Sequence, residues 1–210
     1  MKFVRLILLF FFSIFYISCN EEEQPAPAYR QELAEIVTNE NGKAISLILD
    51  DGQKLIINNV LQGLAADSIY RVKVLYVPTS AIAADLYAAQ SVVSDYARSM
   101  PDSLIISHPL DLKASWMSPR YLNLMVGIMT GGKAQKLAFV ERGLETSNDG
   151  SKILKLQLYH DQCDDNEFYT QEVYMSCPLY PYAGRLQRGR DSVELEVNTY
   201  KGIVQKTFAY

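Results

Sequence analysis

Residues 69–77 read IYRVKVLYV, and side chains alternate there with the two-residue period of a β-strand. The even-numbered positions are apolar or aromatic, while Arg71 and Lys73 fall on the opposite face. One apolar face and one polar face are typical of an antiparallel sheet that covers a core on one side. Pro78 ends the run, because proline cannot donate to a strand ladder.

Similar runs flank this stretch. Upstream, Lys43–Leu49 and Lys54–Ile57 enclose Asp51-Gly52, a favoured two-residue hairpin turn. The second half of the chain contains seven such runs, which predict a sandwich of two antiparallel sheets. They are residues 112–116, 121–129, 135–141, 153–159, 168–175, 192–197 and 203–208.

Residues 80–97 fit two interpretations. Ile82, Leu86, Ala89 and Val93 recur at helical spacing, which predicts a helix. The alternative is a strand over 86–93 that closes a small barrel. Breaks follow at Pro101 and at 108–109, so the sequence predicts one domain over 29–109 and a second over 110–210.

The first 18 residues have the pattern of a secretory signal peptide, with Lys2 and Arg5 before an apolar run at Leu6–Ile17. This run has 12 residues, and a membrane-spanning helix needs about 20. Cys19 follows the small residue Ser18, so the segment resembles a bacterial lipoprotein signal. The resemblance implies that Cys19 becomes the acylated N-terminus of the mature chain and anchors it in a membrane.

Residues 19–28 are predicted to form a lipidated tether. Glu21, Glu22 and Glu23 resemble the acidic tag that sends some lipoproteins to the outer face of the outer membrane, and the alternative is a solvated linker on a protein that faces the periplasm. The prolines at 25 and 27 favour extended backbone. We therefore expect an outer-membrane lipoprotein exposed at the cell surface.

The charge balance argues against nucleic acid as a partner. The whole chain has a formal net charge of −4, and removing the leader with its two basic residues makes it more acidic. Nucleic-acid binding normally requires a basic face. Cys163 and Cys177 remain beside Cys19, and we expect two separate thiols rather than a disulfide, because a simple hairpin would place them far apart.

Two segments resemble the NigD-like lipoprotein family. Residues 116–124, WMSPRYLNL, are similar to the start of the family's C-terminal domain. Residues 156–161, LQLYHD, followed by Asp164-Asp165, are similar to its leucine-rich strand and acidic loop. The resemblance implies an all-β protein in which an OB-like five-stranded barrel precedes an immunoglobulin-like β-sandwich. The family's name comes from a bacteriocin gene cluster, which suggests immunity by association, and no functional residues are carried over.

The sequence predicts neither an enzyme nor a cofactor. None of the common hydrolase, metalloprotease, dinucleotide or phosphate-loop motifs is present, and the only histidines are His108 and His160. His160 is expected to be a core or capping residue. Asp161, Asp164, Asp165 and Glu167 are weak candidates for a calcium site, but their spacing fits no EF-hand and a polar loop is the simpler interpretation.

Tyr180 and Tyr182 are the candidate ligand-binding residues, because exposed aromatic side chains stack on sugars or anchor protein partners. The alternative is that one of them packs inward. Trp116, the sole tryptophan, is expected at the domain junction and mostly buried. The leading hypothesis is a non-enzymatic surface lipoprotein that binds a protein, including a toxin if the immunity association holds. The alternative is a glycan-binding accessory of polysaccharide uptake.

Overall fold

The computed structural model describes residues 28–59 and 61–210. The predicted signal peptide, the lipidation site Cys19 and the acidic tag at 21–23 lie outside these residues. Within the described part, no helix is both long and apolar enough to cross a bilayer.

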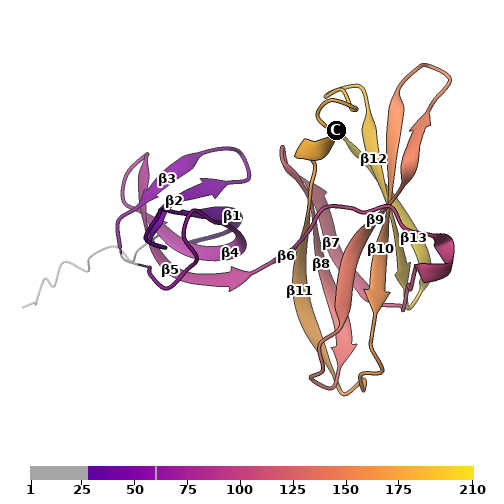
Figure 1. Cartoon of the computed structure of the whole chain (residues 1–210), viewed down its shortest axis with the longest axis horizontal. Coiled ribbons are helices and arrows are strands. Elements are labelled where there is room, and N and C mark those ends of the chain that lie inside the picture. Colours follow the sequence, from indigo (N-terminus) through magenta and orange to yellow (C-terminus); the bar gives the residue numbers. More distant parts are fainter. Residues whose placement is uncertain (1–27, 60) are drawn as a thin grey trace, which may run out of the picture.

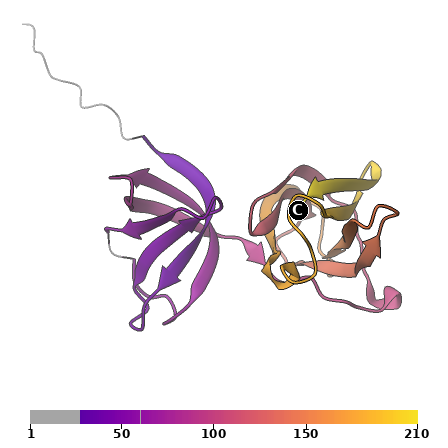
Figure 2. The same ribbon diagram turned by 90° about the horizontal axis from the view of Figure 1, so that it is seen from above.

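The first domain is a closed barrel of five strands (Figures 1 and 2). Its strand order, β1-β2-β3-β5-β4 with β1 pairing back to β4, is that of an OB-like barrel. The strands are β1 (Arg30–Thr38), β2 (Ala44–Leu49), β3 (Lys54–Ile57), β4 (Ile69–Pro78) and β5 (Ala83–Ser91). The alternation over 69–77 is confirmed, since Val72, Val74 and Tyr76 are buried inside the barrel.

The ambiguous segment 80–97 is a strand, not a helix. β5 pairs antiparallel with β4 over most of its length and parallel with β3 at only two positions. The helical spacing of its alanines and leucine misleads because the chain shifts register opposite Leu75 and Tyr76, which moves Ala89 by one position relative to a strict two-residue repeat.

The second domain is a sandwich of two four-stranded sheets (Figure 1). One sheet has the order β13-β12-β10-β9 and the other β6-β11-β8-β7. The strands are β6 (Val93–Ser94), β7 (Asp111–Met117), β8 (Tyr121–Thr130), β9 (Lys136–Thr146), β10 (Lys152–Asp161), β11 (Tyr169–Pro178), β12 (Ser192–Thr199) and β13 (Gly202–Ala209). All seven expected strands of this half are present.

The sequence predicted two antiparallel sheets, but each sheet contains one parallel pair of strands. β12 runs parallel to β10, and β6 runs parallel to β11. The β10–β12 pair is parallel because the chain between them passes through the whole of β11, which belongs to the other sheet, before it returns.

The sandwich domain begins near residue 93, earlier than the expected boundary at 110. β6 already pairs with β11, and the chain then crosses to the opposite sheet. Arg98 bridges to Val140 on β9, and Ser107 bridges to His160 on β10. A short 3-10 turn, η1 (Asp102–Leu104), lies within this crossing segment. Pro101 and Pro109 therefore lie in a segment that crosses the sandwich, and not in a linker between the domains.

Each domain has its own apolar core. The barrel core is built on Ile36, Leu47, Val74 and Tyr76, and the sandwich core is larger and centred on leucines of β8 and β10. The two cores do not merge, so the contacts between the domains are made mainly by polar side chains that lie outside both cores.

Candidate functional site

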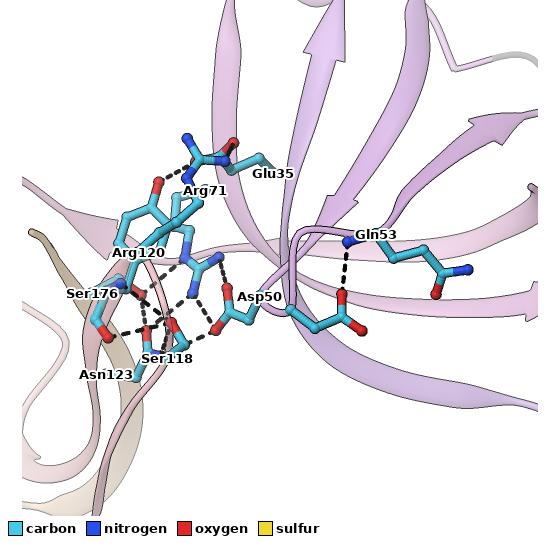
Figure 3. Close-up of polar contacts among 10 residues, drawn as sticks. Glu35, Asp50, Gln53, Arg71, Ser118, Arg120, Asn123 and Ser176 are labelled. Atoms are coloured by element: carbon cyan, nitrogen blue, oxygen red, sulfur yellow. Dashed lines mark hydrogen bonds and ion pairs between the residues drawn. The ribbon is translucent and has the colours of Figure 1, made fainter. Parts of the chain in front are cut away.

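A buried arginine stands at the junction of the two domains (Figure 3). Arg71 projects from the outer face of β4, and its side chain is only 4% exposed. Its two terminal nitrogens contact the carboxylate of Asp50 at 2.5 and 2.9 Å, a bidentate pair within the barrel. Its guanidinium also lies 3.9 Å from the ring centre of Tyr121 in the sandwich, a cation–π contact.

The sandwich satisfies the remaining donors of this arginine. Arg71 Nε donates to Ser176 Oγ at 3.0 Å, and one terminal nitrogen donates to Asn123 Oδ1 at 3.0 Å. Asn123 Nδ2 donates in turn to Asp50 at 3.1 Å. Asn123 and Ser176 are both fully buried. The network therefore runs in both directions across the junction, and each nitrogen of the guanidinium donates at least one hydrogen bond.

A second buried charge lies beside it. Glu35, on β1, is 2% exposed. Its carboxylate accepts a hydrogen bond from Arg120 at 2.8 Å and another from the hydroxyl of Tyr121. Burial, and then the hydrogen bond to Glu35, raise the pKa of Tyr121, so its hydroxyl stays protonated and donates. Each domain thus contributes an anion or a cation that the other neutralises.

The local sequence explains why these side chains meet. Asp50 immediately follows β2, where the tight turn through Gly52 begins. Ser118 closes the β7–β8 turn by exchanging hydrogen bonds with the backbone of Tyr121. The segment 116–124 that carried the family resemblance is this turn, and four of its residues form the sandwich side of the junction: Ser118, Arg120, Tyr121 and Asn123.

A cleft of about 640 Å³ opens beside the network, between the two domains. We call it the interdomain cleft. Glu35, Arg71, Arg120 and Tyr121 line its base. Its rim carries Tyr96 and Tyr180, which are 44% and 51% exposed and pack edge to face with ring centres 5.4 Å apart. Arg120 is the charged group of the base that remains partly open to solvent, with its side chain 37% exposed.

The structure separates the two candidate tyrosines. Tyr180 lies on the rim of the interdomain cleft, but Tyr182 is 3% exposed and packs into the sandwich core. Its hydroxyl donates to Glu141 at 2.8 Å. Both lie in the 3-10 turn η2 (Tyr180–Tyr182), whose curvature turns one ring outward and the other inward. The alternative interpretation, that one of the two tyrosines packs inward, therefore describes Tyr182.

The acidic side chains of the loop after β10 make separate hydrogen bonds within the sandwich and do not converge on a common ligand position. Asp165 accepts hydrogen bonds from Thr130, Gln135 and the backbone N–H groups of Gly131 and Lys133. Asp161 accepts one from the backbone of Cys163, and Glu167 one from Gln162. Asp164 is exposed. Over 28–59 and 61–210, no three His, Cys, Asp or Glu side chains converge as a metal-binding group.

The two histidines lie next to this loop, with their rings packed edge to face. His160 is 1% exposed, and its ring nitrogens face the carbonyl of His108 and the amide oxygen of Gln135. Burial lowers the pKa of His160. His108 Nδ1 accepts a hydrogen bond from the backbone of Gln162. His160 is thus a core residue, as the sequence predicted.

The expectations for Trp116 and for the two cysteines had different outcomes. Trp116 lies at the domain junction beside Lys73 and Tyr174, but it is only half-buried. Cys163 and Cys177 are separate thiols, and burial raises the pKa of Cys177 to about 12. The sequence did not single out Glu35, Asp50, Arg71 or Tyr96. The available signal was the pair of charged side chains, Arg71 and Lys73, on the polar face of this strand, and nothing in the sequence distinguished one from the other.

Comparisons with known proteins agree with this architecture. Residues 93–210 match the family described as "NigD-like C-terminal beta sandwich domain", and this match begins at β6. No match to a curated protein was found.

Solved structures with the same fold cover nearly the whole described chain. A NigD-like immunity protein from Bacteroides caccae is 20% identical, with a TM-score of 0.66 over 87% of this chain and 98% of its own. A putative toxin-related protein from Parabacteroides distasonis is 18% identical, with a TM-score of 0.65 over 87% and 93%.

A putative lipoprotein from Bacteroides fragilis is 13% identical, with a TM-score of 0.58 over 87% of this chain and 97% of its own. At these identities the likeness establishes the fold. The family match covers more than half of the chain and starts where the sandwich starts, and the chain therefore belongs to the NigD-like family.

Proposed function

We propose that this protein is a non-enzymatic lipoprotein of the cell envelope that binds a protein partner in the interdomain cleft. The observation that carries the proposal is the pair of exposed tyrosines, Tyr96 and Tyr180, on the rim of a cleft of about 640 Å³. Tyrosine is enriched among the residues that dominate protein–protein binding energy. A cleft with charged groups at its base and aromatic rings at its rim suits a protein ligand.

The buried network below the cleft supports this function. Arg71 and Glu35 fix the orientation of the barrel relative to the sandwich, since each bonds to side chains of the other domain. A site whose walls are already in place loses less conformational entropy when it binds. Neither histidine lines the cleft, and both are hydrogen-bonded within the sandwich.

The names of the structural relatives agree with a protein partner. One is described as an immunity protein, one as toxin-related and one as a lipoprotein. We propose by association that the partner is a secreted toxin of the bacteriocin type. Acylation at Cys19 and the acidic tag Glu21–Glu23 would place the protein on the outer membrane facing outward, and the alternative is the periplasmic face.

Glycan binding has less support. Exposure of both Tyr180 and Tyr182 on a flat face would have favoured that hypothesis, and Tyr182 is buried. The ring that does neighbour Tyr180, that of Tyr96, stands at 87° to it, so the two rings do not form a flat platform.

The proposal is tested by photo-crosslinking on living cells. p-Benzoylphenylalanine would replace Tyr180, and Tyr200 would serve as the matched control because its exposure is nearly the same, 49% against 51%. We expect a discrete protein adduct from position 180 and none from position 200. Equal labelling at both positions, or recovery of polysaccharide alone, would contradict the proposal.

The anchor is tested in the same cells. Cys19→Ala should release the protein from the membrane fraction, since no acyl chains can then be attached. Continued membrane retention of this variant would overturn the lipoprotein assignment without affecting the crosslinking result.

A further inference from the structure

The wall of the barrel is incomplete at one end, next to the interdomain cleft. A hollow of about 500 Å³ opens there, and its floor is formed by the core residues Ile36, Val72 and Leu86. Leu61 and Leu64, from the segment that follows β3, form one side, and β5 from Leu86 to Ser91 forms the other. None of the described residues that line the hollow carries a charge.

The hollow exists because β5 ends in small residues. Partners in a strand pair place their side chains on the same face of the sheet. Val72 and Val74 are buried inside the barrel, and their partners on β5 are Ser91 and Ala89. Both partners are exposed, although their side chains point to the interior face. Two positions that should carry core side chains therefore leave the barrel unfilled.

The outer edge of β5 is also unpaired at this point. Val92 N–H donates to the carbonyl of Arg71, so the alternation of an antiparallel ladder directs the backbone groups of Ala89 and Ser91 away from β4. β3 pairs with β5 only as far as Ala84. Past Ala84, the side chain of Asn59 pairs with this edge, because its amide donates to the carbonyl of Leu86 and accepts from the N–H of Leu86.

Beyond Leu86 this edge has no partner among the described residues. An unpaired edge beside an apolar hollow is the arrangement that accepts an added strand, in which main-chain hydrogen bonds supply affinity and a pocket selects a side chain. The hollow and the interdomain cleft share Tyr70 and Ser91, so a strand added to β5 would lead directly into the cleft.

We infer that the protein partner contributes an uncharged, extended segment that pairs with β5 at Ala89 and Ser91 and inserts an apolar side chain into the barrel hollow. This inference rests on the proposed function and specifies how the partner enters the cleft. The chain's own tether is a poor occupant, because Pro25 and Pro27 lack the N–H groups that a ladder requires.

The inference is tested with peptides selected from a random displayed library against the mature, lipid-anchored protein in detergent. Selected peptides should carry apolar residues at alternate positions. Hydrogen exchange measured with and without such a peptide should show new protection of the amides of Ala89 and Ser91. Binding without protection of these amides would overturn the inference, and so would failure to select any peptide.

A pair of variants at one position isolates the edge. Ala89→Pro removes the outward N–H while leaving the ladder to β4 intact, because proline is tolerated at an unpaired strand edge. Ala89→Ser keeps the N–H and nearly the same size. We expect Ala89→Pro to weaken peptide binding about tenfold or more, and Ala89→Ser to leave it within about twofold. Equal affinities would contradict strand addition and favour a ligand that needs only the hollow, such as an alkyl chain.

A second pair isolates the hollow. Ser91→Leu places an apolar side chain inside it, whereas Gln90→Leu adds the same side chain to the opposite face of β5. Only Ser91→Leu should abolish peptide binding, and its unfolding temperature should be no lower than that of the native protein, which excludes misfolding as the cause. If the crosslink at position 180 persists in both Ser91→Leu and Ala89→Pro, the strand inference fails while the cleft remains the binding site.

Discussion

Arg71 shows what the sequence can and cannot say about one residue. The alternation over 69–77 places it on the face of β4 opposite to the barrel core, and that orientation is confirmed. What covers that face is the sandwich, through Ser176, which lies 105 positions later in the chain. No local pattern reports a contact at that separation, so an apparently solvent-facing arginine is in fact buried.

The stability of the protein should depend strongly on this side chain. Arg71→Met leaves Asp50 without its bidentate partner. Asn123 and Ser176 also lose the hydrogen bonds that Arg71 donates to them. Breaking a buried ion pair from one side costs about 3–5 kcal/mol of unfolding free energy. Urea unfolding measures the change. The control Lys113→Met removes an ion pair with Asp111 on the surface and should leave the midpoint almost unchanged.

The double variant gives the decisive comparison. Replacing Asp50 by leucine in the Arg71→Met protein removes the orphaned anion and should recover part of the lost stability. If Arg71→Met costs no more than Lys113→Met, the arginine does not hold the junction.

At the scale of elements, the acidic loop after β10 has a structural role. Asp165 ties this loop to the β8–β9 turn with hydrogen bonds from Thr130, Gly131 and Gln135. These donors favour the charged carboxylate and hold the pKa of Asp165 well below its ordinary value, the hydroxyl of Thr130 contributing most. The residue that the sequence offered as a weak calcium ligand thus joins two loops.

This contribution has a defined pH dependence. A carboxyl whose pKa is lower in the folded state stabilises the fold at pH values above the ordinary aspartate pKa of about 4, and the stabilisation fades as the pH falls below it. Asp165→Asn should therefore lower the unfolding temperature at pH 7, and the difference from the native protein should narrow below about pH 4.

Asp164→Asn is the matched control for this measurement. Asp164 is exposed and has a backbone φ of 56°, a conformation that asparagine tolerates well. This variant should behave like the native protein at every pH. A pH-independent loss in Asp165→Asn would contradict the assigned role of its charge.

The strands that the sequence predicted differ from β1, which it did not predict, in how apolar and polar side chains alternate. Strands such as β10 and β12 alternate cleanly because one face lies on the sandwich core and the other is more exposed. β1 was not predicted, because Leu33, Ala34, Glu35 and Ile36 are buried in succession. Its outer face is covered by the sandwich where Glu35 bonds to Arg120, and this face mixes Glu35 with the apolar Leu33 and Val37.

At the scale of the whole molecule, two independent cores are joined by buried polar contacts. The charged barrel side chains in this junction are Glu35, Asp50, Arg71 and Lys73, and their partners in the sandwich include Arg120, Tyr121, Asn123 and Tyr174. The resemblance of residues 116–124 correctly indicated the architecture. It could not indicate that this segment faces the barrel, because its partners lie 52 to 86 positions upstream.

These contacts should make the two domains unfold together. We expect a single calorimetric transition for the native protein. Glu35→Gln removes the charge that neutralises Arg120 and should split the transition into two, with the smaller barrel melting first. Glu40→Gln, on an exposed residue, is the control and should leave one transition. Two transitions in the native protein would contradict the coupling.

The position of Glu35 on β1 has a mechanical consequence. β1 is the first strand after the N-terminal segment, and β2 and β4 pair with it on both sides. A pull on the residues before Tyr29 would load those two ladders in shear, the direction in which many hydrogen bonds must break at once. Glu35 on the same strand bonds to Arg120 and Tyr121. Part of the force would therefore pass directly into the sandwich and not through the covalent connection between β5 and β6. A load on the proposed N-terminal tether would then reach the proposed binding cleft without passing through the covalent connection between the domains alone.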